Sequence, residues 1–352
     1  MHTHRVPSHR WASGRVIPAV LFFFALFASI GVIAHAASDT PDKSAKVDKA
    51  DKPDKTDKID KADKPDKLDK ADSSASTQPG QWLVTTHSGD DVILFSDTGK
   101  LLRELVLAKA GGLAGSRGLL FMPGGDLLVA CSQKAKSAIL RFHPDGTLVG
   151  LFASGGTLSH PYAMAFGPDH NLYVSGQDDD AVSRFNGVTG AFINTFVPAG
   201  AGGMKTIRDI IFDPDGELLV ASRDTNSILK YDGASGKPLG EMVHAGDGGL
   251  SKPIQLLFGP DHNLYVGSSG NSSVIRFNGK TGTLIDVFVK PKDHGLDAPS
   301  GMAFDPATGD LLVESRLGSQ ILRYSASGVF KDVFVDKANL DTPEYILPWP
   351  TP

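Results

Sequence analysis

Four histidines are the residues of this sequence best suited to metal chemistry: His87, His160, His244 and His294. Imidazoles from separate segments of a chain can hold a divalent ion, which then polarises a carbonyl group. The metal site that we consider joins His87 and His160 with Glu344, and it would take calcium, magnesium or zinc. The sequence itself requires no cofactor, and it names no catalytic residue.

Three arginines could instead recognise an anion. Arg208, Arg223 and Arg316 could form a fork-like receptor for a carboxylate or a phosphate, because each guanidinium presents several N–H donors in one plane. The alternative is that these arginines form ion pairs within the protein. The carboxylates that would pair with them are Asp209, Asp224, Glu314 and Glu344.

Other motifs give weaker signals. The run Asp178-Asp179-Asp180 could bind calcium, but it lacks a spaced ligand loop, so we expect a solvated loop tip. Nothing suggests a Ser-His-Asp arrangement, a phosphate-cradling loop or a dinucleotide site, since each glycine-rich stretch lies where a repeat needs a turn.

A repeat of about 46 residues must position these side chains. A phenylalanine ends an apolar run before a proline-containing turn at Phe121, Phe166, Phe212, Phe258 and Phe304, with spacings of 45, 46, 46 and 46 residues. Each repeat contains four short β-rich segments separated by turns, which we name strands A to D. A period of this size is typical of β-propeller blades.

The sequence therefore predicts an all-β fold, a six-bladed β-propeller over residues 80–352. Five blades lie near 116–153, 161–197, 207–244, 253–289 and 299–335. The sixth is divided, because 80–107 supplies strands B, C and D while 342–350 supplies strand A. We expect the C-terminal strand to pair with the N-terminal blade and close the ring.

The pattern P-x-x-h-x-F-x-P-[DG]-x-x-L-[YL]-V resembles NHL repeats and the related gluconolactonase-like and streptogramin-lyase-like propellers, over nearly all of the chain after Gly80. The resemblance implies a site at the channel mouth, as in six-bladed lactonases, streptogramin lyases and amidating lyases. The Glu-Gly-Pro motif of the lactonases and the Trp-Phe-Thr-Glu loops of the streptogramin lyases are absent. The aspartate that often follows the strand-B valine by two positions in NHL repeats is replaced by Thr86, Cys131, Gly176, Ser222, Ser268 and Ser315.

Repetition separates structural residues from functional ones. The basic residue of strand C recurs in five blades, so we expect its stem to cover the sheet with its charge in water or paired. His170 and His262 replace the glycine of a PDG turn, and we interpret them as turn residues. The only cysteine, Cys131, is expected to be a small buried hydrophobe.

Residues that differ between blades are expected on the face where the B–C loops and D–A connections emerge around the channel mouth. The candidate ligand-binding residues are His87, Gln177, Arg208, Asp209, Arg223, Gln255, Arg316 and Glu344. The leading hypothesis is a non-catalytic module that binds a protein, a peptide or a small anionic ligand there. The alternatives are a metal-dependent lyase or hydrolase using the same face, and a structural cell-envelope protein.

The N-terminal part of the chain indicates export. Three arginines, an apolar run from Val16 to Ile33 and the sequence Ala34-His35-Ala36 predict a cleaved signal peptide over 1–36, with an uncleaved anchor as the alternative. Residues 37–79, rich in Asp and Lys, predict a disordered linker. We expect a periplasmic or extracellular monomer with no membrane span after cleavage. Its formal net charge of −5 makes nucleic acid an unexpected partner.

Overall fold

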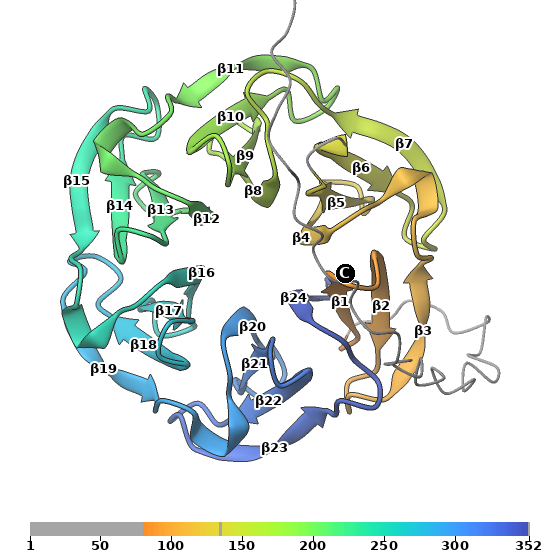
Figure 1. Ribbon diagram of the computed structural model, residues 1–352, viewed down its shortest axis with the longest axis vertical. Coiled ribbons are helices and arrows are strands. Elements are labelled where there is room, and N and C mark those ends of the chain that lie inside the picture. Colours follow the sequence, from red (N-terminus) through yellow and green to blue (C-terminus); the bar gives the residue numbers. More distant parts are fainter. Residues whose placement is uncertain (1–79, 134–135, 351–352) are drawn as a thin grey trace, which may run out of the picture. The chain divides into compact units, whose positions relative to one another are not determined.

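The computed structural model describes residues 80–133 and 136–350. Over these residues the chain forms 24 strands in six four-stranded antiparallel sheets, which are arranged as a ring (Figure 1). The predicted signal peptide and linker lie outside the described residues. Within the described part, no helix is long and apolar enough to cross a membrane.

Both ends of the described chain contribute to one blade, which we call blade 1. Its strands, from the channel outward, are β24 (Pro343–Pro348), β1 (Trp82–Thr86), β2 (Asp91–Phe95) and β3 (Leu101–Val106). Blade 2 contains β4 (Ser116–Phe121), β5 (Leu127–Cys131), β6 (Ala138–Phe142) and β7 (Leu148–Ala153). Blade 3 contains β8 (Pro161–Phe166), β9 (Leu172–Gly176), β10 (Ala181–Phe185) and β11 (Phe192–Val197).

The remaining blades repeat this order. Blade 4 contains β12 (Ile207–Phe212), β13 (Leu218–Ser222), β14 (Ser227–Tyr231) and β15 (Pro238–Val243). Blade 5 contains β16 (Pro253–Phe258), β17 (Leu264–Ser268), β18 (Ser273–Phe277) and β19 (Leu284–Val289). Blade 6 contains β20 (Pro299–Phe304), β21 (Leu311–Ser315), β22 (Gln320–Tyr324) and β23 (Phe330–Val335). Short 3-10 turns occur at Ala110–Gly112, Ala201–Gly203, Asp247–Gly249 and Asp293–Gly295.

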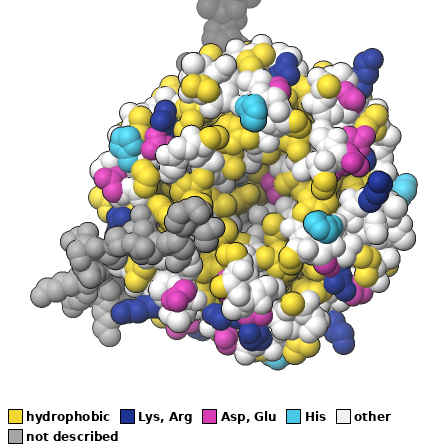
Figure 2. Space-filling model, turned by 180° about the vertical axis from the view of Figure 1, so that it is seen from behind, with side chains coloured by type: hydrophobic (Ala, Val, Ile, Leu, Met, Phe, Trp, Pro, Cys, Tyr) yellow, Lys and Arg dark blue, Asp and Glu magenta, His cyan; other side chains and the backbone are white. Residues whose placement is uncertain are grey.

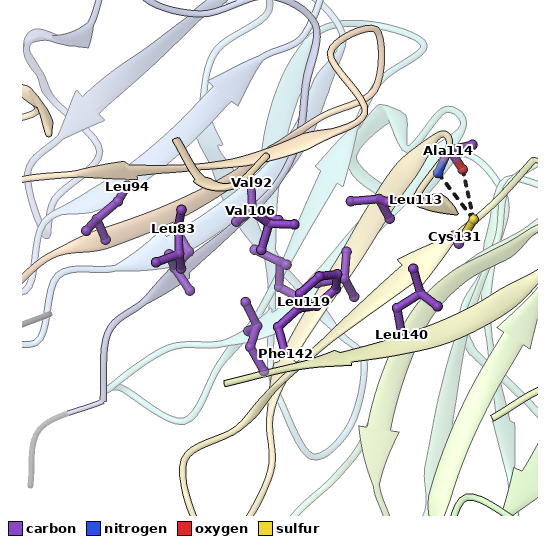
Figure 3. Packing of buried hydrophobic residues seen from close by; sticks show 13 residues of the cluster. Leu83, Val92, Leu94, Val106, Leu113, Ala114, Leu119, Cys131, Leu140 and Phe142 are labelled. Carbon is purple, nitrogen blue, oxygen red and sulfur yellow. Dashed lines mark hydrogen bonds between the residues drawn. The ribbon is translucent and has the colours of Figure 1, made fainter. Parts of the chain in front are cut away.

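The core lies between neighbouring blades. Leu83 and Leu94 of blade 1 pack with Leu119 and Phe142 of blade 2 in one buried cluster (Figure 3). Every residue of the strand-B segment LLVAC is buried, because this strand has a neighbouring blade on each face. On the face that Figure 2 shows, hydrophobic side chains surround the central hollow and most charged side chains lie farther out. Burial between blades therefore ties each blade to the next.

Ring closure occurs as predicted. Strand β24 pairs antiparallel with β1, with Leu83 opposite Leu347 and Val84 opposite Ile346. Ile346 is buried in a cluster that also contains residues of blade 6. The C-terminal strand therefore completes blade 1 and joins it to blade 6.

A glycine in each C–D hairpin lets the blades approach closely. A Cβ added to Gly282 would lie 1.8 Å from the carbonyl oxygen of Met242 in the preceding blade, and the φ of Gly282 is 70°. The equivalent glycines of all six blades face a strand-D carbonyl in the same way, at 1.8–2.3 Å. These glycines are Gly99, Gly146, Gly190, Gly236, Gly282 and Gly328. Only glycine combines this φ with so little space.

The last residue of strand B secures the connection that enters the blade. The hydroxyls of Ser222, Ser268 and Ser315 accept hydrogen bonds of 3.0, 2.9 and 2.8 Å from backbone N–H groups of the D–A connections. Cys131 is buried, as predicted, and its Sγ accepts the equivalent bond from Ala114 at 3.3 Å (Figure 3). These contacts give four of the six positions that depart from the NHL pattern a structural role.

The two structural interpretations of repeated residues are also confirmed. All five strand-C basic residues form ion pairs with carboxylates. These basic residues are Arg141, Arg184, Lys230, Arg276 and Arg323. His170 and His262 both have a φ of 60°, the left-handed backbone of the turn.

The Gly282→Ala variant tests the close approach between blades. Its free energy of unfolding should fall by about 1–2 kcal/mol for the left-handed backbone and roughly a further 1–3 kcal/mol for the collision with the Met242 carbonyl. Gly246→Ala is the matched control, because Gly246 has a φ of 87° but no heavy atom within 4 Å of an added Cβ. Equal losses in urea unfolding of the two variants would contradict this account.

Candidate functional site

The second residues of the six A strands meet at the channel mouth. They line one cavity of about 320 Å³ together with residues of the B–C loops and D–A connections of blades 4 to 6. These second residues are Arg117, Tyr162, Arg208, Ile254, Ser300 and Glu344. Because successive side chains of a strand point to opposite sides, one position per blade is aimed into the mouth.

The cavity is strongly cationic. Its lining contains five basic residues and a single carboxylate, that of Glu344. The basic residues are Arg117, Arg208, Arg223, Lys252 and Arg316. The excess of positive charge contrasts with the net charge of −5 of the whole chain.

Glu344 is already engaged. Its Oε1 lies 2.6 Å from Nη1 of Arg117 and 2.6 Å from Nε of Arg316, and its Oε2 accepts a hydrogen bond of 3.3 Å from the Tyr162 hydroxyl. Burial alone would raise the pKa of Glu344, but the two guanidinium groups outweigh it and hold that pKa below its ordinary value. This carboxylate therefore neutralises part of the charge of Arg117 and Arg316 and leaves that of the other cations.

Arg208 has no carboxylate partner among the described residues. Its Nη1 donates to Oε1 of Gln177, its guanidinium carbon lies 4.7 Å from the centre of the Tyr162 ring, and its Nε is buried without a hydrogen-bond partner. Burial lowers the pKa of Arg208, and the nearby charges of Arg117 and Arg223 lower it further. An anion that enters the cavity would stabilise this guanidinium, because it would supply the missing hydrogen-bond acceptor and the missing negative charge.

The sequence offered two interpretations of three arginines, an anion receptor or ion pairs within the protein, and the structure supports a different one for different arginines. Arg223 pairs with Asp224 at 2.6 Å, in a partly exposed contact, and Arg316 pairs with Glu344. Both pairings are those that the sequence offered as the alternative to a free receptor. Arg208 alone of the three keeps its charge available to a ligand.

Four of the predicted ligand-binding residues lie outside the cavity lining: His87, Gln177, Asp209 and Gln255. Two of them, Asp209 and Gln255, form contacts between blades instead. Asp209 accepts backbone N–H bonds of 2.9 Å from Ile210 and from Leu256 of the next blade, and Gln255 accepts one from Met302 of the blade after. Burial raises the pKa of Asp209 to about 7, and the two backbone donors limit that rise. As third residues of their strands, both link neighbouring blades.

The predicted metal ligands do not form a complete metal site. Nδ1 of His87 and Nε2 of His160 are buried without hydrogen-bond partners. Burial, followed by the charge of Arg117, lowers the pKa of both imidazoles, that of His160 to about 4. The Glu344 carboxylate is held by two arginines, and the described residues contain no group of three His, Cys, Asp or Glu side chains placed to hold a metal ion.

The other candidates for metal binding have different surroundings. The side chains of His244 and His294 are more than half exposed, and His294 stacks on Phe330 at 3.9 Å. In the aspartate run, only Asp178 is exposed, whereas Asp180 accepts backbone N–H bonds from Thr206 and Ile207. Burial raises the pKa of Asp179 to about 6. Internal contacts therefore hold this loop, which is not the solvated tip that the sequence predicted.

Sequence reasoning missed two apolar residues of the cavity. Ile254 is the only aliphatic residue at the second position of strand A, and Leu317 is the only hydrophobic residue at the second position after strand B. The positions equivalent to Leu317 hold Ser88, Gln133, Asp178, Asp224 and Gly270. A blade-by-blade comparison restricted to these positions would have identified both residues.

These observations define a six-bladed β-propeller with an asymmetric, arginine-rich channel mouth. No protein-family model matches the sequence, and no curated protein matches it either. Solved structures do resemble it. Selenomethionine-substituted virginiamycin B lyase from Staphylococcus aureus is 16% identical with a TM-score of 0.55, over 73% of this chain and 81% of that one.

Two further structures resemble the chain to a similar degree. A protein of unknown function from Bacteroides caccae is 16% identical with a TM-score of 0.59, over 77% of this chain and 99% of that one. A chain of the nidogen/laminin complex is 13% identical with a TM-score of 0.59, over 76% and 97%. At these identities the similarity confirms the fold alone, and the neighbours include both an enzyme and a member of a binding complex.

The Glu344→Gln variant tests the buried ion-pair network. Removing the charge leaves Arg117 and Arg316 uncompensated, so the free energy of unfolding at pH 7 should fall by about 3–5 kcal/mol. Because folding lowers the pKa of Glu344, its contribution is present above its ordinary value of 4.5 and is lost as pH falls through the folded pKa. The difference from wild type should therefore shrink at pH 3.5.

The matched control is Glu217→Gln, which removes a partly exposed carboxylate that pairs with Lys230 on the blade surface. Its effect at pH 7 should be no more than about 1 kcal/mol. Urea unfolding at the two pH values measures both variants. A Glu344→Gln loss that is as small as the control, or that is independent of pH, would contradict the account.

Proposed function

We propose that this protein is an exported binding module that takes up a small anionic ligand, bearing a carboxylate or a phosphate, in its channel mouth. The observation that carries this proposal is the half-buried guanidinium of Arg208, which lines the cavity, has a buried Nε without a hydrogen-bond partner, and has no carboxylate partner among the described residues. A bound anion would accept charge-assisted hydrogen bonds from this group. Such bonds are stronger in a partly desolvated cavity than in water.

The dimensions of the cavity favour a small ligand. A volume of about 320 Å³ is at the lower end of the range of small-molecule sites, roughly 300–1,000 Å³. Positive charge is in excess in the cavity lining, while the chain as a whole is acidic. An extended polyanion would meet that acidic surface, so a compact anion fits the charge distribution better.

Arg208 is also held in place before a ligand arrives. Its guanidinium lies over the Tyr162 ring, and Gln177 accepts one of its N–H bonds. A side chain that is already ordered loses little conformational entropy on binding, which favours affinity. Gln177 thus serves the proposed site by orienting Arg208.

A metal-dependent lyase or hydrolase is the second candidate. The observation in its favour is the pair of imidazoles, His87 and His160, each with a buried ring nitrogen that has no partner. A neutral imidazole can act as a metal ligand or as a general base. Saturable zinc binding that is lost in His87→Ala and in His160→Ala would favour this candidate over the binding module.

Anion titrations of the Arg208→Gln variant test the proposal. At low ionic strength, acetate or inorganic phosphate should bind the wild-type protein saturably in calorimetry or ligand-observed NMR. Loss of charge-assisted hydrogen bonds of about 1.5–3 kcal/mol predicts that Arg208→Gln weakens binding roughly tenfold to a hundredfold.

The control is Arg184→Gln, since Arg184 lies on strand β10 and pairs with Asp169 away from the cavity lining. It removes the same charge and should bind like wild type. If the two variants bind the anions equally well, Arg208 is not the receptor and the proposal is wrong.

A further inference from the structure

We infer that the ligand is an amphipathic carboxylate, whose charged group binds Arg208 while its apolar body lies against Ile254 and Leu317. This inference rests on the proposed function and specifies its ligand class. The cavity lining brings cationic and apolar residues together: Arg208 and Arg223 belong to blade 4, and the apolar residues belong to blades 5 and 6.

Ile254 continues an apolar contact that begins beside Arg208. It is 7% exposed and packs in a small cluster with Tyr162 and Ala163 of blade 3. The Tyr162 ring also supports the Arg208 guanidinium at 4.7 Å. An anion bound to Arg208 would therefore extend directly onto an apolar surface formed by Tyr162 and Ile254.

Leu317 supplies apolar surface at the outer end of the cavity. It lines the cavity with a side chain that is 62% exposed, and it belongs to none of the buried hydrophobic clusters of the described residues. Exposed leucine does not stabilise the fold, and the equivalent position is polar or glycine in the other five blades. Ala298 and Pro299 line the cavity beside it.

The two cationic residues that blades 5 and 6 contribute do not alter the separation between the cationic and the apolar part of the cavity lining. Arg316 is held by Glu344, and Lys252 has an exposed side chain. A ligand that was charged along its whole length would place polar groups against Ile254 and Leu317. Burial of these two side chains would then not stabilise the complex. A carboxylate joined to an alkyl or aryl body uses both halves of the cavity.

Chain-length dependence of binding tests the inference. The probes are acetate, hexanoate and 1-hexanol, titrated into the wild-type protein by ligand-observed NMR. Burying one methylene group contributes about 0.8 kcal/mol, or roughly fourfold in affinity, so hexanoate should bind at least tenfold more tightly than acetate even if its chain is only partly buried. Hexanol should bind more weakly than hexanoate because it cannot pair with Arg208.

Variants assign the effect to the cavity. Leu317→Ser should reduce the preference for hexanoate over acetate at least threefold. Leu317 lies in an exposed loop, so this change should not impair folding, and Ile254→Val provides a second, milder reduction of the same surface. Leu284→Ser, on the outer strand β19, is the control and should have no effect.

Each outcome has a definite meaning. If acetate and hexanoate bind equally well and Arg208→Gln weakens both, the proposed function stands and the amphipathic ligand class is overturned. If neither acid binds but inorganic phosphate does, the proposed function stands and the amphipathic carboxylate is overturned. If no acid and no phosphate binds, or if hexanol binds as well as hexanoate and Arg208→Gln changes nothing, the proposed function fails together with the inference.

Discussion

Each blade of this propeller has two apolar faces, and neither can be buried within the blade itself. A linear array of such blades would leave one face of the first and one of the last in water. The pairing of β24 with β1 removes both bare faces, because it places the C-terminal strand inside the N-terminal blade. The buried clusters that join neighbouring blades, and the cavity that the six A strands form together, depend on this closure.

A closed ring of similar blades gives each structural position six near-copies, which allows scaffold and site to be distinguished within one chain. The hairpin glycines and the strand-C basic residues recur because each blade meets the same neighbour in the same way. At the second position of strand A the six residues all differ except for two arginines, Arg117 and Arg208. One of these is compensated by Glu344 and the other is left for a ligand. The asymmetry needed for recognition is therefore concentrated where the strands enter the channel.

The sequence was sufficient to predict the fold. The spacing of the strand-A phenylalanines and the divided sixth blade specified the number of blades and the closing strand. The candidate site was predicted only in part. Arg208, Arg223, Arg316 and Glu344 do line one cavity, and Gln177 orients Arg208.

Asp209 and Gln255 were included because the alternation of side chains along a strand gives two possible faces, and the sequence does not say which face meets the channel mouth. The apolar residues Ile254 and Leu317 were overlooked because hydrophobic side chains in a β protein suggest a core before they suggest a ligand. Which arginine lacks a counter-charge depends on contacts between blades, such as that of Arg316 with Glu344. Local sequence does not contain this information.

A crystal structure with 6-bromohexanoate would test the central claim most directly, since the anomalous signal of bromine locates the apolar end and the density of the carboxylate locates the charged end. The account predicts the carboxylate within hydrogen-bond distance of Arg208 and the bromine between Ile254 and Leu317. Bromine sites confined to the exposed leucines of the outer strands, with no carboxylate at Arg208, would contradict it.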